Sequence, residues 1–351
     1  MISALCRETV SAAALTIADF DAARGLWDGL LARTPAAGLY HGSRWLDLLR
    51  DAYAFDLSVA SLRSRSQVIA ACVMAQSKIP FVRRLVALPF SDRCEPLALE
   101  HEAGPVLLTM LAADPRINAC EIRGAVAPAP WRTVDYFQSW ELSVSAPAWR
   151  LYQGLATNFR RNIARARRLG LRIERGTDRL LLRRFYLLHC GSRRRQGLPV
   201  QPESFFRTVR AIFAPTGDFE VWLASQSGDD LAAVITLRDR DRVYYKWSAR
   251  APDSASGAGH LIVWDIVEAL AGTVRVLDLG RSDLRNHGLN RFKRELGATA
   301  SPLPYSFVPR APQRMSPEVL SGWQTLAAGV WRHLPPRLCR TLGGSIYRYL
   351  S

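Results

Sequence analysis

Residues 57–76 and residues 219–238 share one pattern, which is an apolar run, a polar turn and a second apolar run with an Ala-Ala pair. The length and composition of each run are typical of a β-strand, and the polar turn joins two such strands as a hairpin. Any hairpin with a polar turn resembles this pattern, so two unrelated hairpins would also fit it. We favour duplication of one α/β unit.

Strand-like and helical patterns follow one another along the whole chain, which predicts a layered α/β (α+β) fold with mixed sheets flanked by helices. A chain of 351 residues is long enough for two domains. We expect a weakly ordered lead-in over residues 1–16 and three parts, which are an N-terminal unit, a C-terminal unit and a helical extension, over 1–146, 147–312 and 313–351. Within the second unit, the patterns predict helices over 156–169, 178–192, 202–213 and 259–271, and strands over 219–225, 231–238, 242–249 and 274–279.

The formal charge of +16 and the pI near 10.3 predict an anionic partner: a phosphate group, nucleic acid or an acidic membrane surface. The six cysteines have no Cys-x-x-Cys spacing, so we expect reduced core residues and no metal site. The N-terminus does not have the pattern of a signal peptide, and no apolar run is long enough to span a membrane. We therefore expect a cytoplasmic protein.

The segment from Val274 to Ala298 reads as a buried strand, a sharp turn at Gly280, a polar loop and a short basic helix with Phe292 and Lys293. Lysine is rare in this arginine-rich chain, where it occurs only at positions 78, 246 and 293. An ammonium group is a compact charge whose pKa burial can lower, whereas arginine stays protonated. Lys293 is therefore a candidate functional residue.

This segment resembles the end of the catalytic half of FemAB-like proteins, which belong to the GNAT superfamily of acyltransferases. The resemblance is carried by Asp-Leu-Gly-Arg-Ser at 278–282, by Gly288-Leu-x-x-Phe292-Lys293 and by Leu296-Gly297-Ala298. Three upstream blocks are also similar to the family: 158–170, 192–202, and Tyr-Tyr-Lys-Trp-Ser at 244–248 with Gly-His-Leu at 259–261. It covers roughly residues 40–310 and implies two tandem GNAT-like units.

The resemblance also implies where chemistry occurs. A GNAT fold opens a cleft between two strands that separate, here 242–249 and 274–279, and the acyl group lies in that cleft. Lys293 would then stabilise the oxyanion of the transition state or bind a substrate phosphate, with Phe292 beside it. Asp278 and Asp283 are candidate bases or amine ligands, and structural capping of the loop is an equally good account of each. The expected substrate-binding residues are Arg281, Ser282, Asp283, Tyr245, Lys246 and His260.

Two of these residues have further alternatives. A lone histidine such as His260 is usually a hydrogen-bonded structural residue. Strand alternation places Lys246 on the face opposite Tyr245 and Trp247. No nucleophile motif is present, so we expect no covalent acyl-enzyme.

Two anion-binding elements are predicted. Gly257 and Gly259 precede a helix, where backbone N–H groups and the helix dipole favour a phosphate, although they also fit simple helix initiation. Ser254 stands where ordinary GNAT enzymes have Arg or Gln, which weighs against coenzyme A. In the helix over 156–169 the arginines Arg161, Arg165 and Arg168, continued by Arg172, form one stripe opposite Phe159, Ile163, Ala166 and Gly170.

We expect an N-acyltransferase of FemAB type that moves an acyl or aminoacyl group to an amine of a cell-envelope or polysaccharide precursor. Its donor would be aminoacyl-tRNA or acyl-CoA, used as a co-substrate with no tightly bound cofactor. The alternatives are an acyl-CoA-dependent enzyme acting on exopolysaccharide or a small molecule, and a non-catalytic nucleic-acid-binding protein. Two expected C-terminal helices, over 317–334 and 336–350, carry arginines and aromatic residues, and fit either contact with the inner face of an anionic membrane or packing against the protein.

Overall fold

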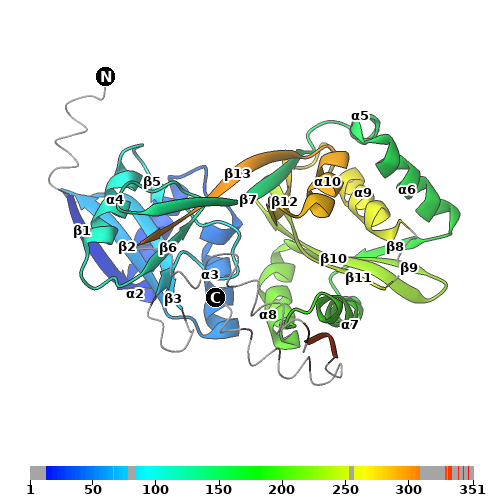
Figure 1. Ribbon diagram of the computed structural model, residues 1–351, viewed down its shortest axis with the longest axis horizontal. Helices are drawn as coiled ribbons and strands as arrows, with labels where there is room; N and C mark the ends of the chain where they lie inside the picture. The colour runs from blue at the N-terminus through cyan, green and yellow to red at the C-terminus, as the bar shows by residue number, and fades with distance from the viewer. Residues whose placement is uncertain are drawn as a thin grey trace. The chain divides into compact units, whose positions relative to one another are not determined.

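A computed structural model describes residues 13–65, 67–77, 84–252 and 257–308, together with Gly329, residues 331–333, Cys339, Gly343 and Tyr347. The chain forms two compact units. Unit 1 contains residues 1–136, 303–321 and 348–351, and unit 2 contains residues 137–302 and 322–347. Strands β7 (Arg132–Ser143) and β13 (Thr299–Val308) each run from one unit into the other along the chain (Figure 1).

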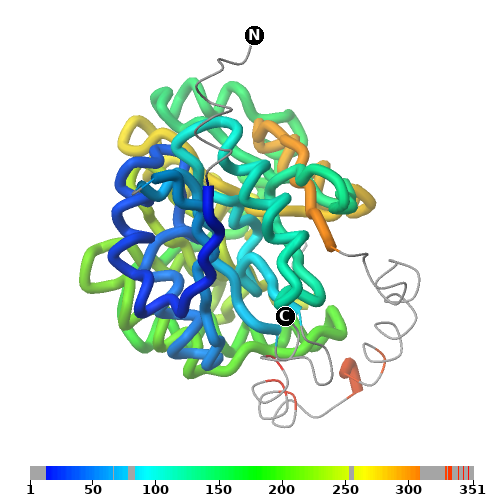
Figure 2. Tube along the Cα trace, turned by 90° about the vertical axis from the view of Figure 1, so that its left-hand side faces the viewer, coloured from blue at the N-terminus to red at the C-terminus, as the bar shows by residue number. Residues whose placement is uncertain are grey.

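The sheet of unit 1 has the strand order β1-β2-β3-β4-β6-β13, with β5 beside β3. All neighbours in it are antiparallel except β4 and β6, which are parallel. The trace of β1, α2 and α3 is drawn in blue in Figure 2. The elements are β1 (Ala13–Asp19), α2 (Phe20–Ala32), a 3₁₀ turn (Leu39–His41), α3 (Ser43–Tyr53), β2 (Leu57–Ser64), β3 (Gln67–Gln76), β4 (Leu85–Val86), β5 (Leu97–Ala98), α4 (Ala103–Ala113) and β6 (Cys120–Arg123).

The sheet of unit 2 has the order β8-β9-β10-β11-β12-β7, and again one pair, β11 and β12, is parallel. Its elements before β13 are α5 (Ala148–Gly154), α6 (Thr157–Arg168), β8 (Arg172–Gly176), α7 (Arg179–Arg195), α8 (Glu203–Phe213), a 3₁₀ turn (Ala214–Thr216), β9 (Phe219–Gln226), β10 (Asp229–Asp239), β11 (Arg242–Arg250), α9 (Ala258–Leu270), β12 (Val276–Asp283) and α10 (His287–Glu295).

The two sheets repeat one topology. In each, two helices connect the first strand to the second, and one helix connects the two parallel strands. The hairpins of the repeated sequence pattern, β2-β3 and β9-β10, hold the same two positions in the two sheets. The tandem α/β fold expected from that pattern is therefore confirmed.

In unit 2, α6, α9 and α10 cover one face of the sheet, and α7 and α8 cover the other (Figure 1). Helix α9 is apolar on most sides, and Leu261 to Val267 are buried except for Asp265. Helix α6 has one apolar face, formed by Phe159, Ile163 and Ala166, and packs it against α9. This core fixes the position of α9, the helix that connects the two parallel strands β11 and β12 along the chain.

Several expectations need correction. Residues 13–19 form a strand, not a weakly ordered lead-in, and β8, β13 and α5 were not expected. The strand expected to end at Leu279 continues to Asp283, because Gly280 is accommodated as a bulge within it. Unit 2 begins at Phe137, inside β7. The expected domain boundary between residues 146 and 147 stays a prediction. The two expected C-terminal helices lie mostly outside the described residues.

Candidate functional site

The parallel strands β11 and β12 pair over three positions and then separate. The register runs from Arg242 opposite Val276 to Tyr244 opposite Asp278, and no pairing follows. Each strand carries a bulge close to this point: in β11 the extra residue is Lys246, and in β12 the irregularity lies between Asp278 and Arg281. Backbone groups on the two facing edges beyond Asp278 are therefore not used in pairing these strands, so the point of separation is a candidate substrate cleft.

The bulge of β12 brings together two of the predicted catalytic residues. The N–H of Gly280, whose φ is 68°, donates to Asp278 Oδ1 at 2.7 Å. Lys293 Nζ, from α10, donates to the carbonyl oxygens of Gly280 at 3.0 Å and of Arg281 at 3.2 Å. Asp278 is 8% exposed and Lys293 is 5% exposed. Both side chains therefore bind the backbone of the bulge from inside the protein.

Phe292, the other predicted catalytic residue, packs in an aromatic cluster that joins α6, α9 and α10. Its ring centroid lies 5.3 Å from that of Phe159 and 5.1 Å from that of His260. His260 and Phe159 meet edge to face at 4.6 Å. Burial lowers the pKa of His260, and the Glu295 carboxylate partly opposes this. His260 is therefore packed between the rings of Phe159 and Phe292, and its substrate-binding role stays a prediction.

Ser282 belongs to a buried polar chain that the sequence did not reveal. Trp140 Nε1 donates to Ser282 Oγ at 2.8 Å, and Ser282 Oγ donates to Asn290 Oδ1 at 2.6 Å. Asn290 Nδ2 in turn donates to the carbonyl oxygens of Asp283 and Leu284 at 3.0 and 3.1 Å. These hydrogen bonds connect β7, β12 and α10, and they account for the buried hydroxyl of Ser282 without a bound substrate. Only the position of Asn290 at the start of the basic helix could have pointed to it.

The two charged neighbours of Ser282 differ. Hydrogen bonds from Arg285 lower the pKa of Asp283, and the Arg285 backbone N–H donates to Asp283 Oδ1 at 2.8 Å, as in a capped turn. Arg281 is exposed, and its guanidinium carbon lies 4.5 Å from the centroid of the Phe137 ring. Burial raises the pKa of Tyr347, and the charge of Arg281 partly opposes this. Tyr347 is a buried residue near the C-terminus, and its proximity to Arg281 was not predicted from the sequence.

On β11, burial raises the pKa of Tyr245 to about 12, so the phenol stays protonated. The face expected for Lys246 was wrong, because its ammonium lies 5.6 Å from the centroid of the Trp247 ring, while its substrate-binding role stays a prediction. Strand alternation fails here because Lys246 is the extra residue of the bulge, with Tyr245 and Trp247 opposite successive residues of β10. A bulge re-aims side chains and cannot be read from hydrophobic periodicity.

The two glycines at the start of α9, Gly257 as its N-cap and Gly259 within its first turn, have different surroundings. Gly257 has a φ of 80°, and a Cβ placed there would lie 3.2 Å from the carbonyl carbon of Asn162 in α6 and closer still to its oxygen. A Cβ on Gly259 would meet nothing within 4 Å. Packing of α9 against α6 therefore accounts for Gly257, whereas Gly259 has open space beside it. The phosphate-binding role of both stays a prediction.

The arginine stripe on α6 is exposed at Arg161, Arg165 and Arg168, as expected, while Phe159, Ile163 and Ala166 are buried. Two members of the predicted faces lie beyond the helix, which ends at Arg168. Arg172 belongs to β8, and Gly170 is exposed in the turn with a φ of 73°. The stripe was extended past the end of the helix, although a glycine at position 170 is the usual sign of a helix C-terminus.

Near the C-terminus, Trp331 and Tyr347 are 8% and 9% exposed. These two aromatic side chains pack into the protein and are not presented to a membrane, whereas Arg332 is exposed. The remaining arginines and aromatic residues of that expectation lie outside the described part. Among the described residues, no helix is long and apolar enough to cross a bilayer. The same residues contain no group of three or more His, Cys, Asp or Glu side chains arranged to hold a metal ion.

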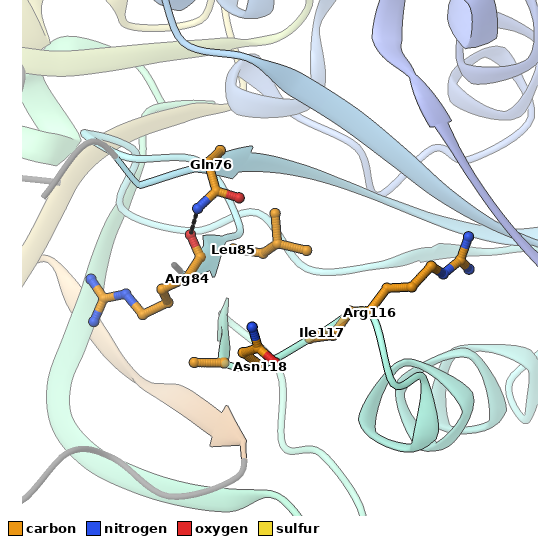
Figure 3. A pocket seen from close by; sticks show the side chains of 7 residues that line it. Gln76, Arg84, Leu85, Arg116, Ile117 and Asn118 are labelled. Atoms are coloured by element: carbon orange, nitrogen blue, oxygen red, sulfur yellow. Dashed lines mark hydrogen bonds between the residues drawn. The ribbon is translucent and has the colours of Figure 1, made fainter. Parts of the chain in front are cut away.

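A concavity of about 200 Å³ in unit 1 is unrelated to the predicted site residues, all of which lie in unit 2. It is lined by Gln76, Arg84, Leu85 and residues 116–119. The guanidinium groups of Arg84 and Arg116 point to opposite sides of it (Figure 3). Each is paired with a carboxylate, Arg84 with Glu121 at 3.5 Å and Arg116 with Asp114 at 2.5 Å.

Residues 154–294 match the family model of the acetyltransferase (GNAT) domain. The chain contains a GNAT-type acyltransferase domain. All of the predicted site residues lie inside this GNAT domain, as does the point where β11 and β12 separate. No curated protein sequence matches the chain.

Solved structures with the same fold cover both units. FemX aligns with a TM-score of 0.60 and 13% identity over 80% of this chain and 95% of its own. A tandem GNAT protein from the clavulanic acid biosynthesis pathway aligns at 0.54 and 12%, over 86% and 100%. The C-terminal domain of a proposed lysylphosphatidylglycerol synthetase from Agrobacterium fabrum aligns at 0.54 and 13%, over 86% and 96%. The chain therefore has the tandem-GNAT fold.

Proposed function

We propose that this protein is an N-acyltransferase that moves an acyl or aminoacyl group to an amine of a cell-envelope or polysaccharide precursor. The observation that carries the proposal is the separation of β11 and β12 directly after Tyr244 and Asp278, within the GNAT domain. A donor lying between the strands would meet backbone groups that the sheet does not use. FemX and the lysylphosphatidylglycerol synthetase domain, which share the fold, support a cell-envelope acceptor.

The reaction proposed is direct transfer. The acceptor amine attacks the donor carbonyl carbon, a C–N bond forms, and the bond from that carbon to the donor's thiol or ribose oxygen breaks. The amine loses one proton to a base and the leaving group gains one. The developing oxyanion needs N–H donors or a cation aimed at it. Of the predicted participants, Lys293 and Asp278 contact the bulge of β12, and Phe292 precedes Lys293 in α10.

Two donors fit the surface of the GNAT domain. Acyl-CoA is the co-substrate of GNAT domains generally, and the open space beside Gly259 leaves room for its pyrophosphate at the start of α9. Aminoacyl-tRNA would use the exposed arginines of α6, which form a surface for a phosphate backbone. Both donors are made in the cytoplasm, where we place the reaction, and an acceptor built at the inner face of the membrane would bring the protein to that surface.

The experiment supplies each donor separately to the full chain. Purified protein is incubated with acetyl-CoA or with charged tRNA, in each case with and without UDP-linked amino sugars and amino acids bearing a free amine. Free thiol, deacylated tRNA and acylated acceptor are measured by mass spectrometry. We expect donor consumption that depends on the acceptor amine, and an N-acetylated acceptor serves as the matched control because its amine is blocked.

A second result separates the proposal from the nucleic-acid-binding alternative. A non-catalytic binder would consume neither donor and would bind many nucleic acids with an affinity that falls steeply with salt. Absence of amine-dependent turnover with both donors, together with such salt-dependent binding, would overturn the proposed function.

A further inference from the structure

The bulge in β12 decides which face of the sheet receives Arg281. In a regular strand, residues three apart point to opposite faces, so Asp278 and Arg281 would be separated. Here Asp278 lies opposite Glu141 and Arg281 lies opposite Ser139, and these two residues of β7 are two apart and share a face. Asp278 and Arg281 therefore share a face because one extra residue has been inserted between them.

The face of the next residue changes too. Ser282 points to the opposite side, where its hydroxyl receives the Trp140 indole N–H and donates to Asn290. Without the bulge, the two residues would exchange faces. Arg281 would then enter the buried polar chain, and a guanidinium there would have no carboxylate partner among those hydrogen bonds, at a high desolvation cost. The hydrogen bond between Trp140 and Ser282 therefore reports directly on the register.

Lys293 stabilises this irregular backbone. Successive carbonyl groups of a regular strand point in opposite directions, so one ammonium cannot donate hydrogen bonds to both. Lys293 Nζ binds the carbonyl oxygens of the consecutive residues Gly280 and Arg281 at 3.0 and 3.2 Å, an arrangement that requires the bulge. A lysine ammonium offers three donors from a single nitrogen, whereas an arginine presents a planar fork. Asp278 completes the arrangement by accepting the Gly280 N–H.

We propose that Lys293 is a positioning residue, which locks the β12 bulge and thereby presents Arg281 on the face of the sheet that it shares with Asp278, to receive an anionic group, phosphate or carboxylate, of a substrate. This proposal rests on the proposed function and names the chemistry of one part of its substrate. Arg281 is exposed on that face. The charges of Arg281 and of Arg193, from α7, both lower the pKa of Tyr347, so the surroundings of Tyr347 are positively charged.

The test uses inorganic pyrophosphate as the probe and the full chain in 150 mM salt (an ionic strength at which charges beyond about 8 Å are screened). The variants are Lys293→Met, Lys293→Arg, Arg281→Gln and their Met/Gln double variant. Arg285→Gln is the matched control, because Arg285 is also exposed and lies on the following loop. Affinity is measured by calorimetry, and the Trp140 indole N–H is followed by NMR, with Trp140→Phe to assign its signal.

We expect Lys293→Met and Arg281→Gln each to weaken pyrophosphate binding about 10- to 100-fold, the size of one charge-assisted hydrogen bond. The double variant should bind no more weakly than Arg281→Gln, because both changes remove the same contact. The Trp140 signal should move in Lys293→Met, move partway in Lys293→Arg, and stay in place in Arg281→Gln. Lys293→Arg retains the charge, so it provides the same readout if Lys293→Met does not fold.

Three results would overturn the inference: an unmoved Trp140 signal in both Lys293 variants, losses of affinity that multiply in the double variant, or wild-type binding of pyrophosphate no tighter than that of Arg281→Gln. Failure of the proposed function looks different. In that case the Trp140 and pyrophosphate results hold, while neither acetyl-CoA nor aminoacyl-tRNA is consumed with any amine.

Discussion

Replacing Gly257 by alanine, with Gly259→Ala as its matched control, separates packing from phosphate binding at the start of α9. Gly257 has a left-handed backbone, which costs an alanine about 1–2 kcal/mol. The added Cβ would also lie 3.2 Å from the Asn162 carbonyl carbon and nearer to its oxygen, so α6 and α9 must move apart. Overpacking of this kind costs roughly 1–3 kcal/mol. The expected loss of stability is therefore about 2–5 kcal/mol.

For a unit of 150–250 residues, each kcal/mol lowers the melting temperature by about 2–4 °C, so Gly257→Ala should lower it by roughly 4–20 °C in a thermal scan. Gly259→Ala should leave it unchanged or raise it slightly, because Gly259 has an ordinary φ, lies within the helix and has open space beside it. If Gly259 instead lies against a phosphate, Gly259→Ala should weaken binding of coenzyme A without any loss of stability. Equal melting temperatures for the two variants would refute the packing account of Gly257.

Two further predictions concern charge. Replacing all three exposed arginines of the α6 stripe by glutamine should weaken binding to heparin and flatten its salt dependence, with unfolding changed by less than about 0.5 kcal/mol; the residues are Arg161, Arg165 and Arg168. A triple change at exposed arginines of α7 and α8 is the control, and equal salt slopes for the two triples would contradict the prediction; those residues are Arg179, Arg183 and Arg207. Burial lowers the pKa of His189 from 6.5 to about 3, so below about pH 6.5 the unfolded chain binds a proton that the folded chain does not. The free energy of unfolding should therefore fall as the pH drops from about 6.5 towards 3. In urea denaturation, His189→Gln should reduce this dependence on pH by up to about 1.4 kcal/mol per pH unit. The control His101→Gln, at an exposed histidine, should leave it unchanged.

The sequence predicted those parts of the fold that depend on hydrophobic period. The repeated hairpins, the helices of the GNAT domain and the buried face of α6 follow from apolar spacing, which local chain geometry converts into structure. Strand β8 was missed because it has few apolar residues, and β13 because Pro302 and Pro304 lie within it, which is unusual for a strand. Arg172–Gly176 has a single partly buried apolar residue, Ile173, and Thr299–Val308 begins with a run of exposed residues.

The site was predicted by residue type and not by geometry. Asp278 and Lys293 do lie together at the bulge of β12, while Phe292 packs against Phe159 and His260. The bulges of β11 and β12 leave no periodic signal in the sequence. Lys246 was misplaced for this reason. Trp140 and Asn290 were missed because a buried hydrogen bond between residues far apart in sequence depends on the register of β7 and β12, which no local pattern specifies.

A comparison of the two units explains why the chemistry is expected in only one of them. In both, the parallel pair of strands ends with an acidic residue, Glu121 opposite Val86 in unit 1 and Asp278 opposite Tyr244 in unit 2. Glu121 is held by two guanidinium groups, from Arg84 at 3.5 Å and from Arg123 at 2.7 Å, and all three side chains are at most 11% exposed. Asp278 instead accepts a backbone N–H, and its strand continues through a bulge to the exposed Arg281. Ion pairs thus occupy the equivalent point in unit 1, because a carboxylate buried there needs cationic partners. Duplication of the unit would have allowed one copy to become a structural support while the other kept an irregular strand end for substrate.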